Sequence, residues 1–183
     1  MKISPEISVA FTGNRDITPH QGLKCVDLDG FLRQALSERI QELYHDGFRN
    51  FLSGGAMGFD LLAAEVVVSL KESFHDIALV VVIPFDGQDE KYSHEDKLVY
   101  ERILREASQV IVINESGYDV AAYHLRNDYM VRHASRVVAY SNGRGKGTRS
   151  TIKLAKKLGV EVENLYKTLA DEVEDEQLSF DFI

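Results

Sequence analysis

The sequence contains little cysteine and no long hydrophobic run. Its single cysteine, Cys25, cannot form an internal disulfide, and zinc sites built on paired cysteines are excluded. The longest uncharged apolar run spans residues 77–85, far less than the ~20 residues that a bilayer-spanning helix needs. The N-terminal residues contain no extended apolar segment of the signal-peptide type. From these absences we expect a protein of the reducing cytosol that has no membrane segment.

The length of 183 residues suits one domain with a sizeable core. The composition, 44% hydrophobic and 27% charged, excludes a wholly disordered or collagen-like chain. The net charge of −8 is unevenly spread, because residues 171–183 carry six acids and no base, while the other residues carry 21 bases and 23 acids. A body near neutrality disfavours duplex nucleic-acid binding, which depends on Lys and Arg contacts to phosphates. We therefore predict a domain over residues 1–168 and an acidic, mobile tail over residues 169–183.

The tail ends in an apolar segment, residues 177–183. This segment resembles the short Gln-Leu-Ser/Asp-Leu-Phe peptide that docks on the bacterial sliding clamp, with Phe180 where Leu is usual and Asp181 intervening. We favour the alternative that Phe180 and Phe182 pack on the chain's own domain or on a sister subunit of a homo-oligomer. Docking on a sliding clamp stays the second interpretation.

Short apolar runs alternate with longer amphipathic stretches along the chain. The apolar runs predict strands at residues 7–11, 51–52, 78–83, 110–113, 137–140 and from 160 onward. The stretches between them predict helices over residues 28–48, 61–70, 95–107, 123–134 and 148–158, with Gly47 and Gly159 as helix ends. Strands that are apolar on both faces and alternate with helices form parallel sheets covered on both sides. The predicted fold class is therefore a single α/β, Rossmann-like domain with a parallel sheet of about six strands and helices on both faces.

Three of the expected strand-to-helix turns carry residues that suit an anionic ligand. They are residues 12–15 (Thr-Gly-Asn-Arg), residues 53–60 with three glycines, and residues 141–148 with Arg144 and Lys146 between glycines. Glycine lets the backbone approach a ligand closely, while helix N-termini and cations favour phosphate. The alternative is that these are plain turns, in which glycine serves only the backbone conformation. The turns match neither the G-x-G-x-x-G fingerprint nor the P-loop ending.

Because parallel strands all end at one edge of a sheet, we expect the three turns to form one composite anion site. The expected ligand-binding residues are Thr12, Gly13, Arg15, Ser53, Gly54, Gly55, Met57, Gly58, Asp60, Pro84, Arg126, Asn127, Gly145, Gly147 and Thr148. Asp60 either accepts sugar hydroxyls or caps its helix. Arg126 either clamps an anion or is an ordinary solvated arginine.

The candidate catalytic residues are Asp60, Glu65 and Arg126. Glu65 is an acid within an apolar helix, so it needs a partner or a cleft. A structural ion pair, a solvated face and a catalytic role all stay open for it. At ~100° per residue, Asp60 and Glu65 lie about 140° apart on the helix, which disfavours a carboxylate dyad. The six histidines show no metal-binding spacing, and no metal site is predicted.

These motifs, in this order, resemble the YpsA-like branch of the SLOG superfamily. The resemblance covers about residues 7–165 and rests on residues 11–15, 52–65, 83–85, 126–130 and 145–148. It implies a Rossmann-like domain that binds a nucleotide or a nucleotide-derived ligand. The superfamily includes the Lonely Guy phosphoribohydrolases and the DNA-processing protein DprA.

Two departures from the relatives' motifs bear on catalysis. The branch usually reads Thr-Gly-His-Arg-Pro after the first strand, whereas here Asn14 and Asp16 replace His and Pro. The Lonely Guy motif, Gly-Gly-x-Gly-Thr-x-x-Glu, ends in a Glu that helps to cleave the N-glycosidic bond. In this chain Arg144 replaces the first Gly and Thr151 replaces that Glu. The resemblance thus implies a retained phosphate cradle without the catalytic carboxylate, and it gives Arg126 a substrate-anchoring role.

The sequence leaves three functions open. The leading one is a cytosolic protein that binds a nucleotide-type ligand such as NAD, ADP-ribose or a nucleoside monophosphate, with ligand sensing as one interpretation of its role. The second is a nucleotide N-glycosidase in which Asp60 or Glu65 replaces the missing carboxylate. The third is a DprA-like single-stranded DNA binder, which the slightly acidic body disfavours.

Overall fold

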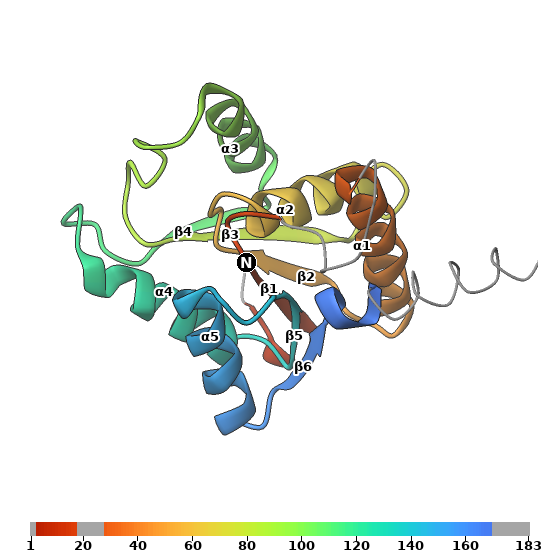
Figure 1. The fold of residues 1–183 in the computed structure, drawn as a ribbon. Coiled ribbons are helices and arrows are strands. Elements are labelled where there is room, and N and C mark those ends of the chain that lie inside the picture. Colours follow the sequence, from red (N-terminus) through yellow and green to blue (C-terminus); the bar gives the residue numbers. More distant parts are fainter. Residues whose placement is uncertain (1–2, 18–27, 170–183) are drawn as a thin grey trace, which may run out of the picture.

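The computed structural model describes residues 3–17 and 28–169. Its strands are β1 (Ser8–Gly13), β2 (Asn50–Ser53), β3 (Ala78–Ile83), β4 (Gln109–Val112), β5 (Arg136–Tyr140) and β6 (Glu161–Asn164). They form one sheet in the order β4-β3-β2-β1-β5-β6, and every neighbouring pair is parallel (Figure 1). The predicted Rossmann-like α/β fold with a six-stranded parallel sheet is confirmed.

Five helices follow the strands where the apolar periodicity predicts them. They are α1 (Leu28–His45), α2 (Phe59–Leu70), α3 (His94–Glu106), α4 (Val120–Arg132) and α5 (Lys146–Lys157), and a short 3₁₀ turn, Pro5–Ile7, precedes β1. Gly47 and Gly159 end α1 and α5 in left-handed conformations, with φ of +100° and +74°. After each of them the next residue donates to the carbonyl five positions earlier, as in a Schellman motif. Both predicted helix ends are confirmed.

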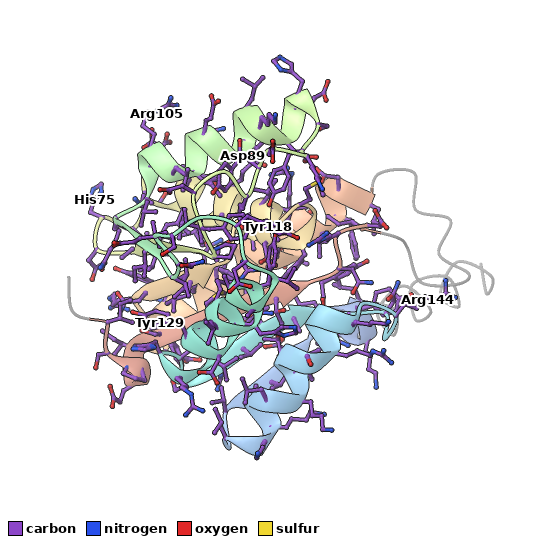
Figure 2. The ribbon with its side chains drawn as sticks, turned by 90° about the vertical axis from the view of Figure 1, so that its left-hand side faces the viewer. His75, Asp89, Arg105, Tyr118, Tyr129 and Arg144 are labelled. Carbon is purple, nitrogen blue, oxygen red and sulfur yellow. The ribbon has the colours of Figure 1, made fainter. Side chains whose placement is uncertain are left out.

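Helices cover both faces of the sheet. Alternate strand residues point to opposite faces, so Val9 and Phe11 pack with α1, α2 and α3, while Ala10 and Leu52 pack with α4 and α5. Figure 2 shows α3, which carries Arg105, on one side of the sheet, and Arg144, beside the start of α5, on the other. The sheet thus lies between two apolar layers, one on each face.

The sheet order places the switch point of the fold beside β1. From β1 the chain builds outward through β2, β3 and β4 on one side, and through β5 and β6 on the other. The connections that leave β1 and β5 therefore run to opposite faces, and a crevice opens at the carboxyl ends of these two strands. In folds of this type ligands bind in that crevice, so the turns after β1 and β5 are the expected place for a ligand site.

Several expectations fall on residues outside the described ranges. These are the expectations for Cys25, the acidic tail from residue 170 and the clamp-like segment 177–183. Within the described residues, no helix combines the length and the apolar character that crossing a bilayer requires.

Candidate functional site

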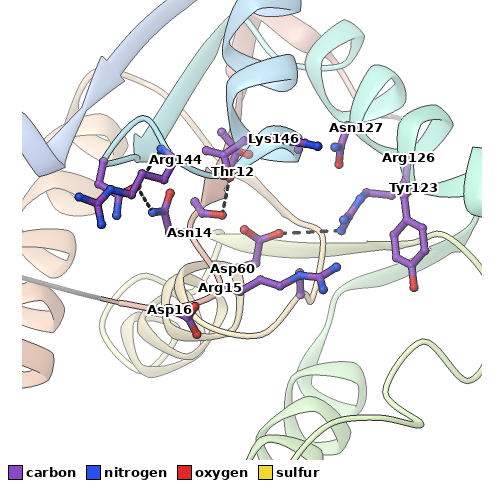
Figure 3. Close-up of a pocket in the computed structure, with 16 residues that line it drawn as sticks. Thr12, Asn14, Arg15, Asp16, Asp60, Tyr123, Arg126, Asn127, Arg144 and Lys146 are labelled. Atoms are coloured by element: carbon purple, nitrogen blue, oxygen red, sulfur yellow. Dashed lines mark hydrogen bonds and ion pairs between the residues drawn. The ribbon is translucent and has the colours of Figure 1, made fainter.

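A pocket of about 550 Å³ opens at the carboxyl ends of β1 and β5 (Figure 3). The turn after β1, the start of α2, one face of α4 and the start of α5 form its walls. Its lining residues are Thr12, Gly13, Asn14, Arg15, Asp16, Ala56, Asp60, Tyr123, Arg126, Asn127, Asn142, Arg144, Gly145, Lys146, Gly147 and Thr148. The volume lies within the range of ordinary small-ligand pockets, ~300–1,000 Å³.

The structure brings together only part of the expected binding set. Among the expected residues, those that line the pocket are Thr12, Gly13, Arg15, Asp60, Arg126, Asn127, Gly145, Gly147 and Thr148. Those that do not line it are Ser53, Gly54, Gly55, Met57, Gly58 and Pro84. The turns after β1 and β5 thus supply most of the pocket. The glycine-rich turn after β2 contributes Ala56 and Asp60 to it.

Positive charge is concentrated in the pocket. Arg15, Arg126, Arg144 and Lys146 line it, opposed by the carboxylates of Asp16 and Asp60, although the whole chain carries −8. Across residues 3–17 and 28–169, no group of three or more His, Cys, Asp and Glu side chains is arranged to hold a metal ion. The charges of the pocket favour an anionic ligand.

Arg126 of α4 points into the molecule toward Asp60 of α2 (Figure 3). Arg126 Nη1 lies 3.8 Å from Asp60 Oδ2, and the two side chains are only 6% and 9% exposed. The Nε and Nη1 atoms of Arg126 are buried without a hydrogen-bond partner. Buried charged donors without an acceptor are costly. The Arg126 guanidinium therefore retains unused donor capacity at the wall of the pocket.

Gly54 makes room for this arginine. A Cβ at residue 54 would lie 1.6 Å from Arg126 Nη1 and 2.7 Å from Asp60 Oδ2. The turn that contains Gly54 is fixed from inside by Ser53, whose Oγ donates to the Asp60 carbonyl at 2.7 Å and accepts from the Gly55 N–H at 3.1 Å. Gly54 therefore permits close approach of a side chain from α4, and Ser53 shapes the turn without lining the pocket.

Burial shifts the protonation of the buried pair. It raises the pKa of Asp60 to about 6, although Arg126 and the backbone N–H groups of Gly13, Ala56 and Gly54 oppose the shift by stabilising the carboxylate. Burial also lowers the pKa of the Arg126 guanidinium, against the opposing effect of Asp60. The carboxylate thus changes charge close to neutral pH, inside a pocket that carries a fixed arginine.

The remaining glycines of the turn after β2 serve internal packing. Gln88 Nε2 donates to the Gly54 and Gly55 carbonyls at 3.1 Å, and the Tyr92 hydroxyl donates to the Gly55 carbonyl at 3.0 Å. Gly58 has φ of +78°, and a Cβ there would lie 2.1 Å from the Arg15 carbonyl oxygen. The segment between β3 and α3 thus covers this turn.

Met57 and Pro84 also lie outside the pocket lining. Pro84 follows the last residue of β3, and its carbonyl accepts from the Asn114 N–H at 2.9 Å. It therefore joins the turn after β3 to the end of the neighbouring strand, which is a structural contact.

The start of α5 presents backbone donors to the pocket. Gly145 is its N-cap and provides no side-chain cap, so the first-turn N–H groups lack an intrahelical partner and favour an anion. Thr148 Oγ1 donates to the Gly13 carbonyl at 2.7 Å and ties α5 to the end of β1. Thr151, at the place of the missing glutamate, donates to the Gly147 carbonyl at 3.0 Å and does not line the pocket.

Glu65 lies on another side of α2. Its Oε2 pairs with Arg33 Nη2 at 2.8 Å, and its Oε1 lies 3.9 Å from Arg102 Nη1. It does not line the pocket. Of the interpretations left open for Glu65, the structure shows the ion pair, and it places Glu65 and Asp60 in separate surroundings.

The expected list of individual binding residues omits several residues that line the pocket: Asn14, Asp16, Ala56, Tyr123, Asn142, Arg144 and Lys146. Asp16 and Tyr123 lie outside the three turns that the sequence indicates, whereas the other five lie within them. Tyr123 could have been found from its place three residues before Arg126 on a helix. Arg144 and Lys146 stand between glycines in the turn after β5. Asn14 donates to Asn142 Oδ1, while its own Oδ1 is buried without a partner, and no spacing in the sequence indicates this pairing.

The molecule is thus a Rossmann-like α/β domain whose candidate site lies at the switch point of a parallel sheet. A family model for YpsA, described as the YspA SLOG family, matches residues 28–169, and the chain belongs to this family. Similar relatives are the UPF0398 proteins of Bacillus thuringiensis (strain Al Hakam) and Bacillus cereus (strain B4264). Each is 28% identical over 166 residues, which cover 86% of this chain and 86% of the relative.

Two solved structures share the fold. DNA processing protein A from Helicobacter pylori, described for its single-stranded DNA binding mode, aligns with a TM-score of 0.58 and 20% identity over 87% of this chain and 64% of the other. DNA processing protein A (DprA) from Streptococcus pneumoniae aligns with a TM-score of 0.59 and 19% identity over 85% of this chain and 48% of the other. The present chain therefore spans less than two thirds of either protein.

Proposed function

We propose that this chain binds a nucleotide or a nucleotide-derived ligand in the pocket at the ends of β1 and β5. The observation that carries the proposal is Arg126, a buried arginine whose Nε and Nη1 atoms lack acceptors at the wall of a cationic pocket. A phosphate provides several strong acceptors and suits the geometry of a guanidinium. The membership in the SLOG family supports the same reading.

Two parts of the pocket suit two parts of such a ligand. The first turn of α5, with Lys146 on it and Arg144 before it, suits a phosphate. On the opposite wall Tyr123 presents an aromatic side chain close to Arg126 (Figure 3), and aromatic rings are suitable surfaces for a base. NAD, ADP-ribose and a nucleoside monophosphate are the ligand candidates. In the cytosol such a binding protein would act as a sensor.

Asp60 has a different role in this proposal from the one expected for it. Its carboxylate faces Arg126 and accepts hydrogen bonds from the backbone N–H groups of Gly13, Gly54 and Ala56. We therefore assign Asp60 the main role of orienting the Arg126 guanidinium, and contact with a sugar hydroxyl is a lesser role. Removing Asp60 would leave the guanidinium without the partner that fixes it.

Nucleotide N-glycosidase activity is the second candidate, and one observation favours it. Burial raises the pKa of Asp60 to about 6, which suits a general acid or base near neutral pH. In such a reaction a protonated carboxyl group would donate its proton to the leaving base, while water attacks the anomeric carbon. Binding and cleavage therefore use the same pocket and differ in their products.

Calorimetric titration with ADP-ribose, NAD and a nucleoside monophosphate tests the proposal, followed by chromatography of each mixture after long incubation. Saturable binding with recovery of intact ligand supports a binding protein. Release of the free base supports the N-glycosidase, and the Asp60→Asn variant should then abolish the release. Failure of all three ligands to bind, even at millimolar concentration, would argue against the proposed function.

A further inference from the structure

A second hollow adjoins the nucleotide pocket and carries a different surface. It has a volume of about 490 Å³ and lies between α5 and the segment that follows β6. We call it the basic groove; its charged residues are Arg149, Lys153, Lys156 and Lys167. Of the described residues, no acidic side chain lines it. The proposed nucleotide site makes no use of these four cations.

Helix geometry places three of the cations in one row. Arg149, Lys153 and Lys156 are spaced four and three residues apart, so they share a face of α5. Among the described residues, none of the four groove cations forms an ion pair. Four exposed positive charges around one hollow create a local positive potential that attracts anions.

Within the described part of the chain, the acids nearest in the sequence to the groove, Glu161 and Glu163, are paired elsewhere. On β6, Glu161 pairs with Arg136 at 2.7 Å and Glu163 pairs with Arg39 at 2.8 Å. Among residues 3–17 and 28–169, no acid therefore offsets the positive charge of the groove, although the whole chain carries −8.

The basic groove and the nucleotide pocket adjoin each other. Asn142 lines both of them, and Lys146 in the pocket begins the helix that carries the groove cations. At 1.5 Å per residue, the path from Lys146 to Lys156 along α5 is about 15 Å long. Figure 2 shows Arg144 beside the same end of α5. Positive charge therefore extends well beyond the space that one nucleotide would occupy.

We propose that the basic groove holds the phosphates of a single-stranded oligonucleotide whose end lies in the nucleotide pocket. This inference rests on the proposed function, because it requires the pocket to accept a nucleotide. In a duplex each strand carries one phosphate per ~3.4 Å of axis, so a row of about 15 Å faces several phosphates. Partly buried Ile152 and Tyr166 line the groove between the cations and provide apolar surface for a base.

Access of a base to the pocket favours a single strand over a duplex. A base within a duplex would have to leave its stack to enter the pocket, which costs a few kcal/mol. A single strand avoids most of that cost. The slightly acidic body of the chain does not oppose such binding, because at physiological salt only charges within ~8 Å act strongly on the bound phosphates.

Binding of 5′-phosphorylated single strands of increasing length, from a mononucleotide to about eight nucleotides, tests the inference. Fluorescence anisotropy at several salt concentrations gives both the affinity and its salt dependence. The test variant is Lys153→Gln with Lys156→Gln. The matched control is Lys157→Gln, which removes an exposed cation of the same helix that does not line the groove.

We expect the affinity of the wild-type chain to rise with strand length. In the double variant that gain should be lost, while mononucleotide affinity is unchanged. Each lost phosphate contact should reduce the slope of log K against log salt by about 0.7, so the double variant should lose about 1.4. The Lys157→Gln control should keep the length-dependent gain.

Three results would overturn the inference. The first is a mononucleotide that binds as tightly as the longest strand, which leaves the proposed function intact. The second is an equal loss of affinity in the Lys157→Gln control, which shows a general charge effect. The third is strand binding only after the acids of residues 171–176 are neutralised in the full-length chain, which makes the tail the occupant of the groove. If neither mononucleotide nor oligonucleotide binds, the proposed function fails as well.

Discussion

Arg126 Nη1 and Asp60 Oδ2 lie 3.8 Å apart, nine-tenths buried, in a space that exists because residue 54 is glycine. Burial of two opposite charges is not by itself a stabilising device, because desolvation of both groups offsets much of their attraction. Two guanidinium nitrogens also lack acceptors. These features support the proposal that Arg126, oriented by Asp60, contacts an anionic ligand.

Replacement of Arg126 by alanine should greatly weaken ligand binding. Truncating one partner of a buried, hydrogen-bonded charge pair typically costs ~2–5 kcal/mol of binding free energy, and the bound phosphate would lose a bidentate donor. Calorimetry with ADP-ribose measures the loss, and a thermal melt of the same sample shows whether the domain is folded.

Arg132→Ala is the matched control for this change. Arg132 lies on the same helix, but its side chain is 55% exposed and paired with Asp128 four residues earlier. Its removal should leave ligand affinity unchanged and lower the free energy of unfolding by less than ~1 kcal/mol. Equal losses of affinity in the two variants would contradict a specific role for Arg126.

Gly54→Ala should disrupt the same site by displacing the Arg126 side chain. The new Cβ would lie 1.6 Å from Arg126 Nη1, so the guanidinium must move away from Asp60. Overpacking of this kind costs about 1–3 kcal/mol of stability, and ligand affinity should fall with it. Chemical denaturation and calorimetry measure the two effects.

Gly147→Ala provides the comparison for stability. Gly147 is in the first turn of α5, and a Cβ there meets no atom within 4 Å. Alanine is favoured over glycine in helices by up to ~1 kcal/mol, so this variant should be at least as stable as the wild type. If the Gly54→Ala and Gly147→Ala variants are equally stable, the close contact predicted for a Cβ at residue 54 does not destabilise the fold.

The Glu65→Gln variant should show that Glu65, unlike Asp60 on the same helix, has no role in ligand binding. Glu65 pairs with Arg33 at 2.8 Å and lies outside the pocket. The variant should lose no more than ~1 kcal/mol of stability, because Arg33 is 40% exposed. Its ligand affinity, and any release of base from a nucleotide, should equal those of the wild type. A large effect on either would return Glu65 to the list of functional residues.

Much of the fold follows from local patterns in the sequence. The alternation of apolar runs with amphipathic stretches gives the strands and helices, and Gly47 and Gly159 end two helices because glycine adopts positive φ readily. Rules for parallel sheets then bring the turns after β1 and β5 to one edge. These rules act on short segments or on general topology, which is why a single sequence is enough for them.

The role of the glycine-rich turn after β2 could not be derived in this way. A glycine that admits a ligand and a glycine that admits a neighbouring side chain look the same in a sequence. Gly54 is next to Arg126, which comes from another helix, and Gly55 is covered by Gln88 and Tyr92. Only the packing of α4 and of the segment after β3 decides between the two readings.

Ligand affinity should depend on pH through Asp60. Its pKa is raised to about 6, so the carboxylate is mostly ionised near pH 7 and mostly protonated near pH 5. The ionised form competes with a bound anion for Arg126 and repels the anion. Affinity should therefore rise as the pH falls through about 6, by up to tenfold for each unit by which the bound anion raises the pKa of Asp60 further.

ADP-ribose is the suitable ligand for this measurement, because a nucleoside monophosphate itself takes up a proton near pH 6. No histidine is among the described residues that line the pocket, and burial raises the pKa of Asp60 into this range. In Asp60→Asn the carboxylate is replaced by a neutral group of the same shape, and the rise in affinity at lower pH should disappear. Calorimetry at about pH 5, 6 and 7 compares the two proteins. An Asp60→Asn variant that keeps the wild-type pH dependence would show that another group governs the charge of the site.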